Sequence, residues 1–511
     1  MTAFWARLFI NIEWAFFAYF LCINAAYLAL HYVSVFSIFR YMRDHRADYL
    51  PRDLPAYQPP ISILIPAFNE ERSINSTIHS LLQLDYPEFE VVIVSDGSTD
   101  ATLSSVIREF AMVEFPEAYR QRIQTERIRN IYASTRYPNV RLVDKDNGGK
   151  ADALNAGINC VRYPLFCSID ADCILHPTSL GRVVRPFLED SNTVATGGVV
   201  RVLNGCTVKD GFLEKVELPR KFLPMFQNVE YLRAFLFGRM GWSPPNALLV
   251  ISGAFGVFRK ERVVALGGYR TDTVGEDMDL VVRLHRQSRE ERRPYHITFV
   301  PDPICWTEVP SDLRSLKGQR MRWQRGLAES LVPNVGLLFS RRGGTVGWLA
   351  FPFMLLFEFL GPVIEILGYV AMIILWSLHL IPLLFFLVFL FLAVGMGIML
   401  STNAIFLEEL SFQMYPRVGQ QLRLFVAAVL ENLGYRQLIA FWRVIGVLKW
   451  LFSGKARSHW GRIARDGAWQ HPPVLREGAT REGAARKGDT SKGDTSKADT
   501  RQAGAREGSK P

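Results

Sequence analysis

Two long apolar regions flank a middle region in which short apolar runs alternate with polar positions. In the first region, residues 14–39 carry no formal charge over 26 positions, more than the roughly 20 residues that a helix needs to cross a bilayer. Only Arg7 precedes this run, whereas arginines follow it at positions 40, 43 and 46. Because arginine is enriched on the cytoplasmic side of a span, we expect an uncleaved anchor followed by a cytoplasmic segment.

The second apolar region centres on residues 366–407, which hold 42 positions without a formal charge. Two spans of about 20 residues each would have to start earlier and take in Glu358 and Glu365. Such intramembrane carboxylates suggest a function, but an interfacial helix broken at Gly361–Pro362 explains them slightly better. Residues 422–452 are apolar and carry several charges, so a third span and an amphipathic surface helix both fit.

The middle region has the rhythm of strand, turn and helix. Its apolar runs are ISILIPAF (61–68), FEVVIVSD (89–96), VRLVDK (140–145) and PLFCSIDAD (164–172), and KADALNAGINCV between the last two has a helical pattern. Continuous apolar strands alternating with helices indicate an α/β fold with a parallel sheet that is covered on both faces.

Polar side chains follow each predicted strand at its carboxyl end. These residues are Asn69, Glu70, Asp96, Lys145, Asp146, Asp170 and Asp172. Ligands of open α/β sheets bind in the crevice beyond the carboxyl ends of the strands. The pattern therefore predicts a ligand-binding crevice at this edge.

Asp170 and Asp172 stand one residue apart at the end of a buried strand. Unpaired buried charge is costly, so either the pair lies in solvent at a turn or a positive group sits between its members. A divalent cation fits the second case, because hard cations take carboxylate oxygens and bridge to substrate phosphates.

Two further loops carry candidate binding residues. In VSDGSTD (94–100), Asp96 can accept hydrogen bonds from a base or a ribose. In DNGGKADALNAG (146–157), two glycines and Lys150 precede a helix. A helix start of this kind suits an anionic group, although Gly-Gly as a plain turn fits equally well.

The segment TDTVGEDMDLVVRLHR (271–286) predicts a packed helix with Glu276 and Asp277 in its first turn. The helix dipole favours carboxylates there, which would explain Glu276 as a capping residue. Asp277 can instead act as a general base that faces the crevice. The cluster QRMRWQRG (319–326) fits a membrane-proximal basic helix, or a site with Arg322 on a phosphate and Trp323 stacked on a sugar ring.

Composition adds three constraints. Hydrophobic residues make up 49% of the 511 residues and the net charge is +10, which positive-inside flanks and lipid headgroups explain without a nucleic acid. The six cysteines form no C-x-x-C pair, so we expect reduced, buried thiols rather than a zinc site.

The chain is expected to divide into four parts. We expect an anchor over residues 1–40, an α/β domain over 58–335, transmembrane or interfacial helices over 345–452 and a disordered low-complexity tail over 470–511.

Taken in order, seven motifs resemble those of the family-two membrane glycosyltransferases over roughly residues 58–330. They are IPAFNEE, VSDGSTD, NGGKADALNAG, DAD, SGAFGVFRK, GEDMDL and QRMRW. Within this family the chain is most similar to poly-β-1,6-N-acetylglucosamine synthases, with cellulose, chitin and hyaluronan synthases as more distant relatives. The resemblance implies a GT-A fold, which is Rossmann-like, with flanking transmembrane helices.

The resemblance also implies roles for individual residues. Asp277 would be the general base with Glu276 beside it as a second catalytic candidate, and Asp170 and Asp172 would hold Mg²⁺ or Mn²⁺. The substrate-binding candidates are Asn69, Glu70, Asp96, Lys150, Asp170, Gln319, Arg322 and Trp323.

Three of these assignments are more specific. Asp96 would bind the nucleotide, Lys150 would lie near the uridine diphosphate, and the match to Q-x-x-R-W (319–323) would border the acceptor site of a processive enzyme. One departure is Ser95, where many relatives have aspartate, so the role of that first acidic position is open.

The implied activity is inverting, metal-dependent and processive polymerisation of a UDP-sugar. UDP-N-acetylglucosamine is the expected donor. The product would be an exopolysaccharide that crosses the plasma (inner) membrane from a cytoplasmic catalytic domain. By analogy with the family, a partner protein would continue the export path across the envelope. Alternatives are the transfer of one sugar to a lipid acceptor and a non-catalytic membrane scaffold.

Overall fold

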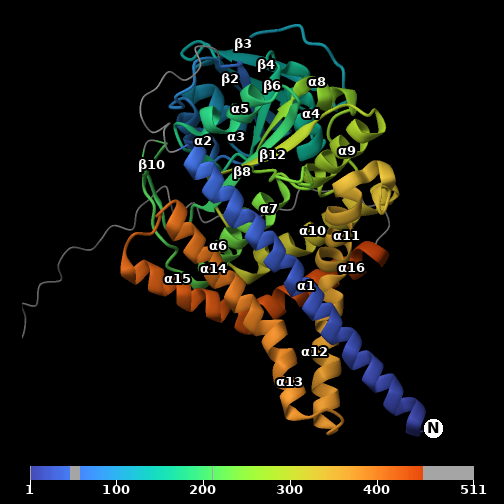
Figure 1. Ribbon diagram of the computed structural model, residues 1–511. Helices are drawn as coiled ribbons and strands as arrows, with labels where there is room; N and C mark the ends of the chain where they lie inside the picture. The colour runs from blue at the N-terminus through green and yellow to red at the C-terminus, as the bar shows by residue number, and fades with distance from the viewer. Residues whose placement is uncertain (1, 46–57, 210, 453–511) are drawn as a thin grey trace, which may run out of the picture. The chain divides into compact units, whose positions relative to one another are not determined.

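The computed structural model describes residues 2–45, 58–209 and 211–452. The tail predicted over residues 470–511 lies outside the described residues. In the described part, a ten-stranded mixed sheet has the order β3-β4-β5-β2-β1-β6-β11-β8-β12-β7 (Figure 1). Its strands are β1 Ile61–Ala67, β2 Phe89–Asp96, β3 Met112–Glu114, β4 Ile128–Ser134, β5 Val140–Lys145, β6 Leu165–Ile169, β7 Ile174–Leu175, β8 Thr193–Val202, β11 Phe255–Arg259 and β12 His296–Thr307. A separate two-stranded sheet pairs β9 Thr207–Lys209 with β10 Phe212–Lys215.

The four strands predicted from the sequence are confirmed, and they are neighbours. β1 pairs in parallel with β2 and β6, and β2 pairs in parallel with β5. Their carboxyl ends therefore meet at one edge of the sheet, where the polar residues noted above are placed.

The four predicted strands are parallel, but the sheet as a whole is mixed, because β11 runs antiparallel to both β6 and β8. Phe255, the first residue of β11, pairs with Ile169, the last residue of β6. The chain thus enters β11 at the edge where the carboxyl ends of the parallel strands meet. β11 must therefore run in the direction opposite to β6. The same arrangement brings the backbone just before Phe255 to the carboxyl end of the parallel strands.

Helices of the α/β region cover the sheet and join its strands. They are α2 Ile74–Leu81, α3 Thr102–Glu109, α4 Lys150–Cys160, α5 Ser179–Glu189, α6 Phe222–Leu232, α7 Met240–Trp242, α8 Lys260–Ala265, α9 Glu276–Glu290 and α10 Leu313–Leu331. A π-helical segment, Arg233–Arg239, connects α6 to α7. α4 packs on β1 and β2 so closely that a Cβ on Gly157 would lie 2.7 Å from the side chain of Leu64.

The apolar helices are α1 Thr2–His45, α11 Phe351–Phe353, α12 Gly361–Ser377, α13 Leu383–Leu390, α14 Met396–Ser411, α15 Val418–Leu430 and α16 Arg436–Phe452. By length and hydropathy, three stretches in the described residues are able to cross a membrane: Asn11–Asp44, Leu383–Ser411 and Val418–Phe452. A fourth candidate is the pair Val346–Phe359 and Gly361–Ser377, which is bent by 46° at the predicted break. The backbone of Leu433 and Gly434 is not helical, so the last stretch is kinked.

Ion pairs join the apolar helices to the α/β region. Arg201 of β8 pairs with Glu408 of α14, and both side chains are buried. Glu358, which the sequence left between two readings, accepts a hydrogen bond from Tyr27 at 2.5 Å and pairs with Arg443 at 3.1 Å. Glu358 is half-buried, and Arg443 of α16 supplies the opposite charge, so this second contact joins the apolar helices to one another.

The six cysteines are free thiols, as predicted. The expectation that all are buried is wrong for Cys22 alone, which is exposed on α1. α1 is an apolar helix, so this exposed face is one that a bilayer would cover.

Candidate active site

A cavity of about 1480 Å³ opens at the carboxyl edge of the parallel strands. Most of the candidate residues from the sequence line it: Asn69, Glu70, Lys150, Asp170, Asp172, Glu276, Asp277, Gln319, Arg322 and Trp323. The structure therefore brings together residues from five separate segments of the chain. Asp96 is the exception.

Lys150, the first residue of α4, lies among carboxylates. Its Nζ atom is 2.6 Å from Asp170 Oδ1 and 3.8 Å from Glu276 Oε1, and it donates a 3.4 Å hydrogen bond to the carbonyl of Gly253. Burial alone would lower the pKa of Lys150, but the carboxylates of Asp170 and Glu276 hold it above its usual value. Lys150 is therefore a permanent cation in this cavity.

Asp277 lies in the first turn of α9 and faces the cavity. Its Oδ2 atom accepts a hydrogen bond from the backbone N–H of Gly253 at 2.9 Å, and its Oδ1 atom accepts one from Met278 at 2.8 Å. The antiparallel entry of β11 brings Gly253 into this position. The carboxylate is thus held in one orientation while it remains at the cavity wall.

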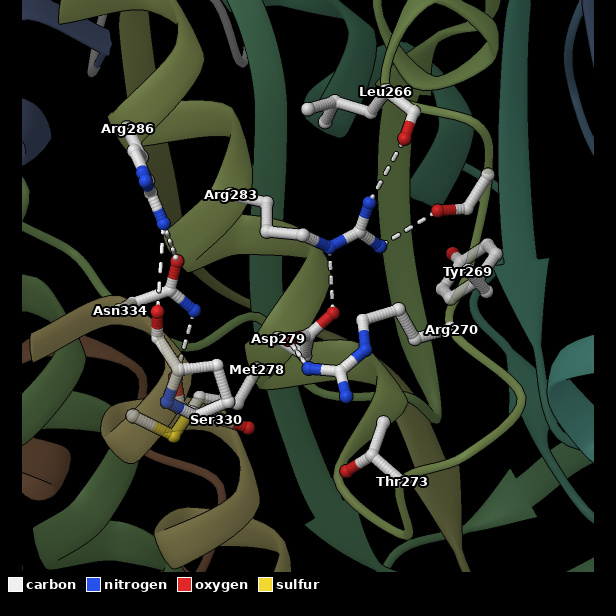
Figure 2. A network of polar contacts seen from close by, with 12 residues as sticks. Leu266, Tyr269, Arg270, Thr273, Met278, Asp279, Arg283, Arg286, Ser330 and Asn334 are labelled. Atoms are coloured by element: carbon white, nitrogen blue, oxygen red, sulfur yellow. Dashed lines mark hydrogen bonds and ion pairs between the residues drawn. The ribbon is translucent and has the colours of Figure 1, made fainter.

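A buried network below Asp277 orients α9. Figure 2 shows Asp279 between two guanidinium groups, with Arg270 at 3.1 Å and Arg283 at 2.7 Å. Arg283 also donates to the carbonyl groups of Leu266 and Gly268. Asp279 is not among the site residues predicted from the sequence. Its place two residues after Asp277, on the buried side of the same helix, indicates a carboxylate that needs a partner inside the protein.

Two glycines let α9 approach α10. A Cβ on Gly275 would lie 2.8 Å from the backbone of Gly326, and a Cβ on Gly326 would lie 2.8 Å from Gly275. Atoms cannot approach this closely without displacing a backbone. Any larger residue at either position would therefore separate Asp277 from the side chains of the Q-x-x-R-W segment.

On α10, Gln319 is 9% exposed and its Oε1 atom has no hydrogen-bond partner in the described residues. Trp323 is 45% exposed. The guanidinium of Arg320 lies 4.4 Å from the centroid of the Trp323 ring and pairs with Glu230 at 2.7 Å. Arg320, which the sequence analysis passed over, therefore fixes the indole at the cavity wall.

Asp96 does not line the cavity, so its position does not support the predicted direct contact with a nucleotide. Its side chain is fully buried and is paired with Lys145 Nζ at 2.6 Å. It also accepts hydrogen bonds from the backbone N–H groups of Gly148 and Gly149 at 3.0 and 2.7 Å. Asp96 thus shapes the glycine loop in front of Lys150 from below.

Asp170 and Asp172 were expected to hold a cation. Asp172 is 2% exposed and accepts a 3.3 Å hydrogen bond from the hydroxyl of Thr307, whereas Asp170 is paired with Lys150. Within the described ranges, no group of three or more His, Cys, Asp or Glu side chains is arranged around a metal position. Two carboxylates on one turn still fit Mg²⁺ or Mn²⁺, since such ions commonly complete their shell with water and substrate phosphates.

Burial raises the pKa of Glu276 to about 7, against the opposing effect of Lys150. The folded protein therefore binds more protons than the unfolded chain between about pH 4.5 and pH 7, and Glu276 makes stability fall as the pH rises through this window. In Glu276→Gln we expect this dependence to weaken by roughly 1–3 kcal/mol across the window. Melting temperatures measured from pH 5 to pH 8 would test this.

Glu290→Gln is the matched control, because Glu290 lies exposed at the other end of α9. Its variant should reproduce the pH dependence of the unmodified protein. Equal slopes in all three proteins would contradict the prediction for Glu276.

Comparison with known families assigns this fold and its cavity to the glycosyltransferases. Residues 62–118 match the description "Glycosyl transferase family 2", and residues 118–326 match "Glycosyltransferase like family 2". The chain is thus a relative of the family-two glycosyltransferases, and the α/β fold class predicted from the sequence is confirmed.

Among curated proteins, the chain is similar to poly-β-1,6-N-acetyl-D-glucosamine synthases. It is 29% identical over 273 residues to the synthase of Staphylococcus epidermidis and 28% identical over 277 residues to that of Staphylococcus aureus strain COL. Each match covers 53% of this chain and 55% of the relative. The matched part therefore spans about half the length of these relatives.

Two solved structures are also similar. The Pyrobaculum calidifontis mannosyltransferase in complex with GDP-mannose and Mn²⁺ is 19% identical, with a TM-score of 0.46 over 81% of this chain and 99% of that chain. Residues 1–349 of Staphylococcus aureus TarS are 15% identical, with a TM-score of 0.35 over 74% and 91%.

Proposed function

We propose that this protein is an inverting β-glycosyltransferase that polymerises a UDP-sugar, UDP-N-acetylglucosamine as the first choice, at the plasma (inner) membrane. The observation that carries the proposal is the convergence of Asp277, Lys150, the Asp170–Asp172 pair and the Q-x-x-R-W side chains on one cavity. The names of the curated relatives supply the choice of sugar.

In this proposal the donor diphosphate lies at the start of α4, where Lys150 and the N–H groups of the glycine loop favour negative charge. Asp170 and Asp172 would hold the cation. When bound, Mg²⁺ or Mn²⁺ would neutralise charge on the leaving diphosphate. Arg322, which also lines the cavity, is a second cation for that charge.

The transfer step is a single displacement. An acceptor hydroxyl oxygen forms a bond to the anomeric carbon as the bond from that carbon to the phosphate oxygen breaks and UDP leaves. Asp277 takes the proton of the hydroxyl. Attack from the face opposite the diphosphate converts an α-linked donor into a β-linked product, and Trp323 orients the acceptor ring.

Processivity and export belong to the same proposal. Gly446 and Lys449 of α16 line the cavity, and α16 is part of the candidate span Val418–Phe452. A chain elongated in this cavity would therefore meet a membrane helix as it grows. A partner that continues the path beyond the membrane is proposed by family analogy alone.

The test is incorporation of radiolabelled sugar by membranes that contain the full chain. We expect long polymer from UDP-N-acetylglucosamine but not from UDP-glucose, with loss of synthesis on chelation of Mg²⁺ and Mn²⁺ and recovery when either is restored. A short lipid-linked product would indicate single transfer instead. No incorporation with any donor would favour the scaffold alternative.

A further inference from the structure

Arg239, at the end of the π-helical segment Arg233–Arg239, lines the cavity and belongs to none of the motifs discussed above. Its guanidinium carbon lies 3.8 Å from the centroid of the Phe235 ring. Its Nη1 atom is buried and has no hydrogen-bond partner in the part of the chain that the structure describes. The ring fixes the plane of the guanidinium but leaves this N–H without an acceptor.

A buried N–H group of a cation is costly to leave without an acceptor, and most such groups are paired. Burial lowers the pKa of Arg239 to about 10, with Asp277 opposing the shift. The group therefore stays protonated at neutral pH and remains a donor. These observations indicate that a ligand in the cavity supplies the missing oxygen.

The surroundings of Arg239 favour a neutral ligand over a diphosphate. Glu230 and Tyr231, on the same wall of the cavity, present a carboxylate and an aromatic ring. Asp277 is the carboxylate that acts on Arg239 and would repel a diphosphate placed there, whereas Glu230 is paired with Arg320 beneath Trp323. Lys150, the cation placed for the diphosphate, lies on another element.

Gln319 of α10 adds a second buried polar atom without a partner among the described residues to the cavity lining. Its Oε1 atom is a buried acceptor without a donor, while Arg239 Nη1 is a buried donor without an acceptor. A sugar hydroxyl can accept one hydrogen bond and donate another. A carbohydrate that carries several hydroxyl groups can therefore satisfy orphaned donors and acceptors alike, whereas a deprotonated phosphate oxygen can only accept.

We propose that Arg239 binds the acceptor sugar, donating a hydrogen bond to a hydroxyl or N-acetyl oxygen so that the reacting hydroxyl lies beside Asp277. This inference rests on the proposed function, since it names a residue of the acceptor half of that site. Arg239 then contributes to acceptor affinity and not to donor affinity.

The test measures two affinities of the purified full chain in detergent, one for UDP and one for β-1,6-linked N-acetylglucosamine oligosaccharides. In Arg239→Ala we expect the oligosaccharide Kd to rise roughly 10–100-fold and the UDP Kd to stay within about twofold. Arg239→Lys, which keeps a donor, should recover part of the loss. Arg341→Ala, at an exposed arginine outside the cavity lining, is the matched control and should bind both ligands normally.

A loss of UDP affinity with oligosaccharide affinity unchanged would overturn the inference and place Arg239 on the diphosphate. Unchanged affinity for both ligands, or an unmodified chain that binds no oligosaccharide, would also overturn it. If the unmodified chain binds oligosaccharide through Arg239 but incorporates no sugar, the proposed function fails and the acceptor site stands. The two failures are thereby distinguishable.

Discussion

The variant Asp277→Asn is expected to lose transfer activity by roughly 10²–10⁴-fold, the range observed for loss of a general base. Asparagine has nearly the volume of aspartate and can still accept the hydrogen bond from the backbone N–H of Gly253. It cannot take a proton from an acceptor hydroxyl. The measurement is sugar incorporation at saturating donor, together with UDP affinity, which should change little.

Asp272→Asn provides the matched control for this variant. Asp272 lies in the segment that leads into α9, is 57% exposed and pairs with Arg270. The same chemical change there should leave most of the activity. If Asp277→Asn retained activity similar to that of Asp272→Asn, Asp277 would not be the base and Glu276 would become the candidate to examine.

The second large effect concerns Lys145, which is fully buried between two carboxylates. Its Nζ atom lies 2.6 Å from Asp96 and 2.6 Å from Asp152. Lys145→Met keeps the length and most of the volume of the side chain but leaves both carboxylates without their cation. Breaking a buried pair in this way costs about 3–5 kcal/mol of unfolding free energy, so we expect a clearly lower melting temperature.

Donor affinity should fall in the same variant, because Asp96 also holds the N–H groups of Gly148 and Gly149. Arg129→Met is the matched control: the ion pair of Arg129 with Asp146, close by, is 51% and 43% exposed. Exposed pairs contribute about 0–1 kcal/mol. Equal melting temperatures for the two variants would show that Lys145 does not hold the loop together.

Local patterns in the sequence were enough to predict the elements that carry the candidate site. The strands that lead to Asn69, Asp96 and Asp170 and the helix that starts at Lys150 were placed within three residues of the observed bounds. Apolar alternation and the glycines at turns report local backbone conformation directly. The candidate site residues named from the motifs all line the cavity, apart from Asp96.

Tertiary structure decided what those residues contact. The contacts of Lys150 with Glu276, of Asp277 with Gly253 and of Gly275 with Gly326 join segments that are distant in the chain. No local period encodes such pairs, because they depend on how helices and strands pack.

The same reason explains the largest departures from expectation. β11 runs antiparallel to β6 because the chain enters it at the edge where the cavity lies. This direction places the backbone N–H of Gly253 within hydrogen-bond distance of Asp277. Asp96 became a support for the glycine loop because Lys145 on the adjacent strand neutralises it. By itself, the sequence determined the resemblance to a family, the four parallel strands that carry the site and the candidate residues at their ends. Only the packing of distant segments decided which charges pair, and it left Arg239 Nη1 without an acceptor among the residues that the structure describes.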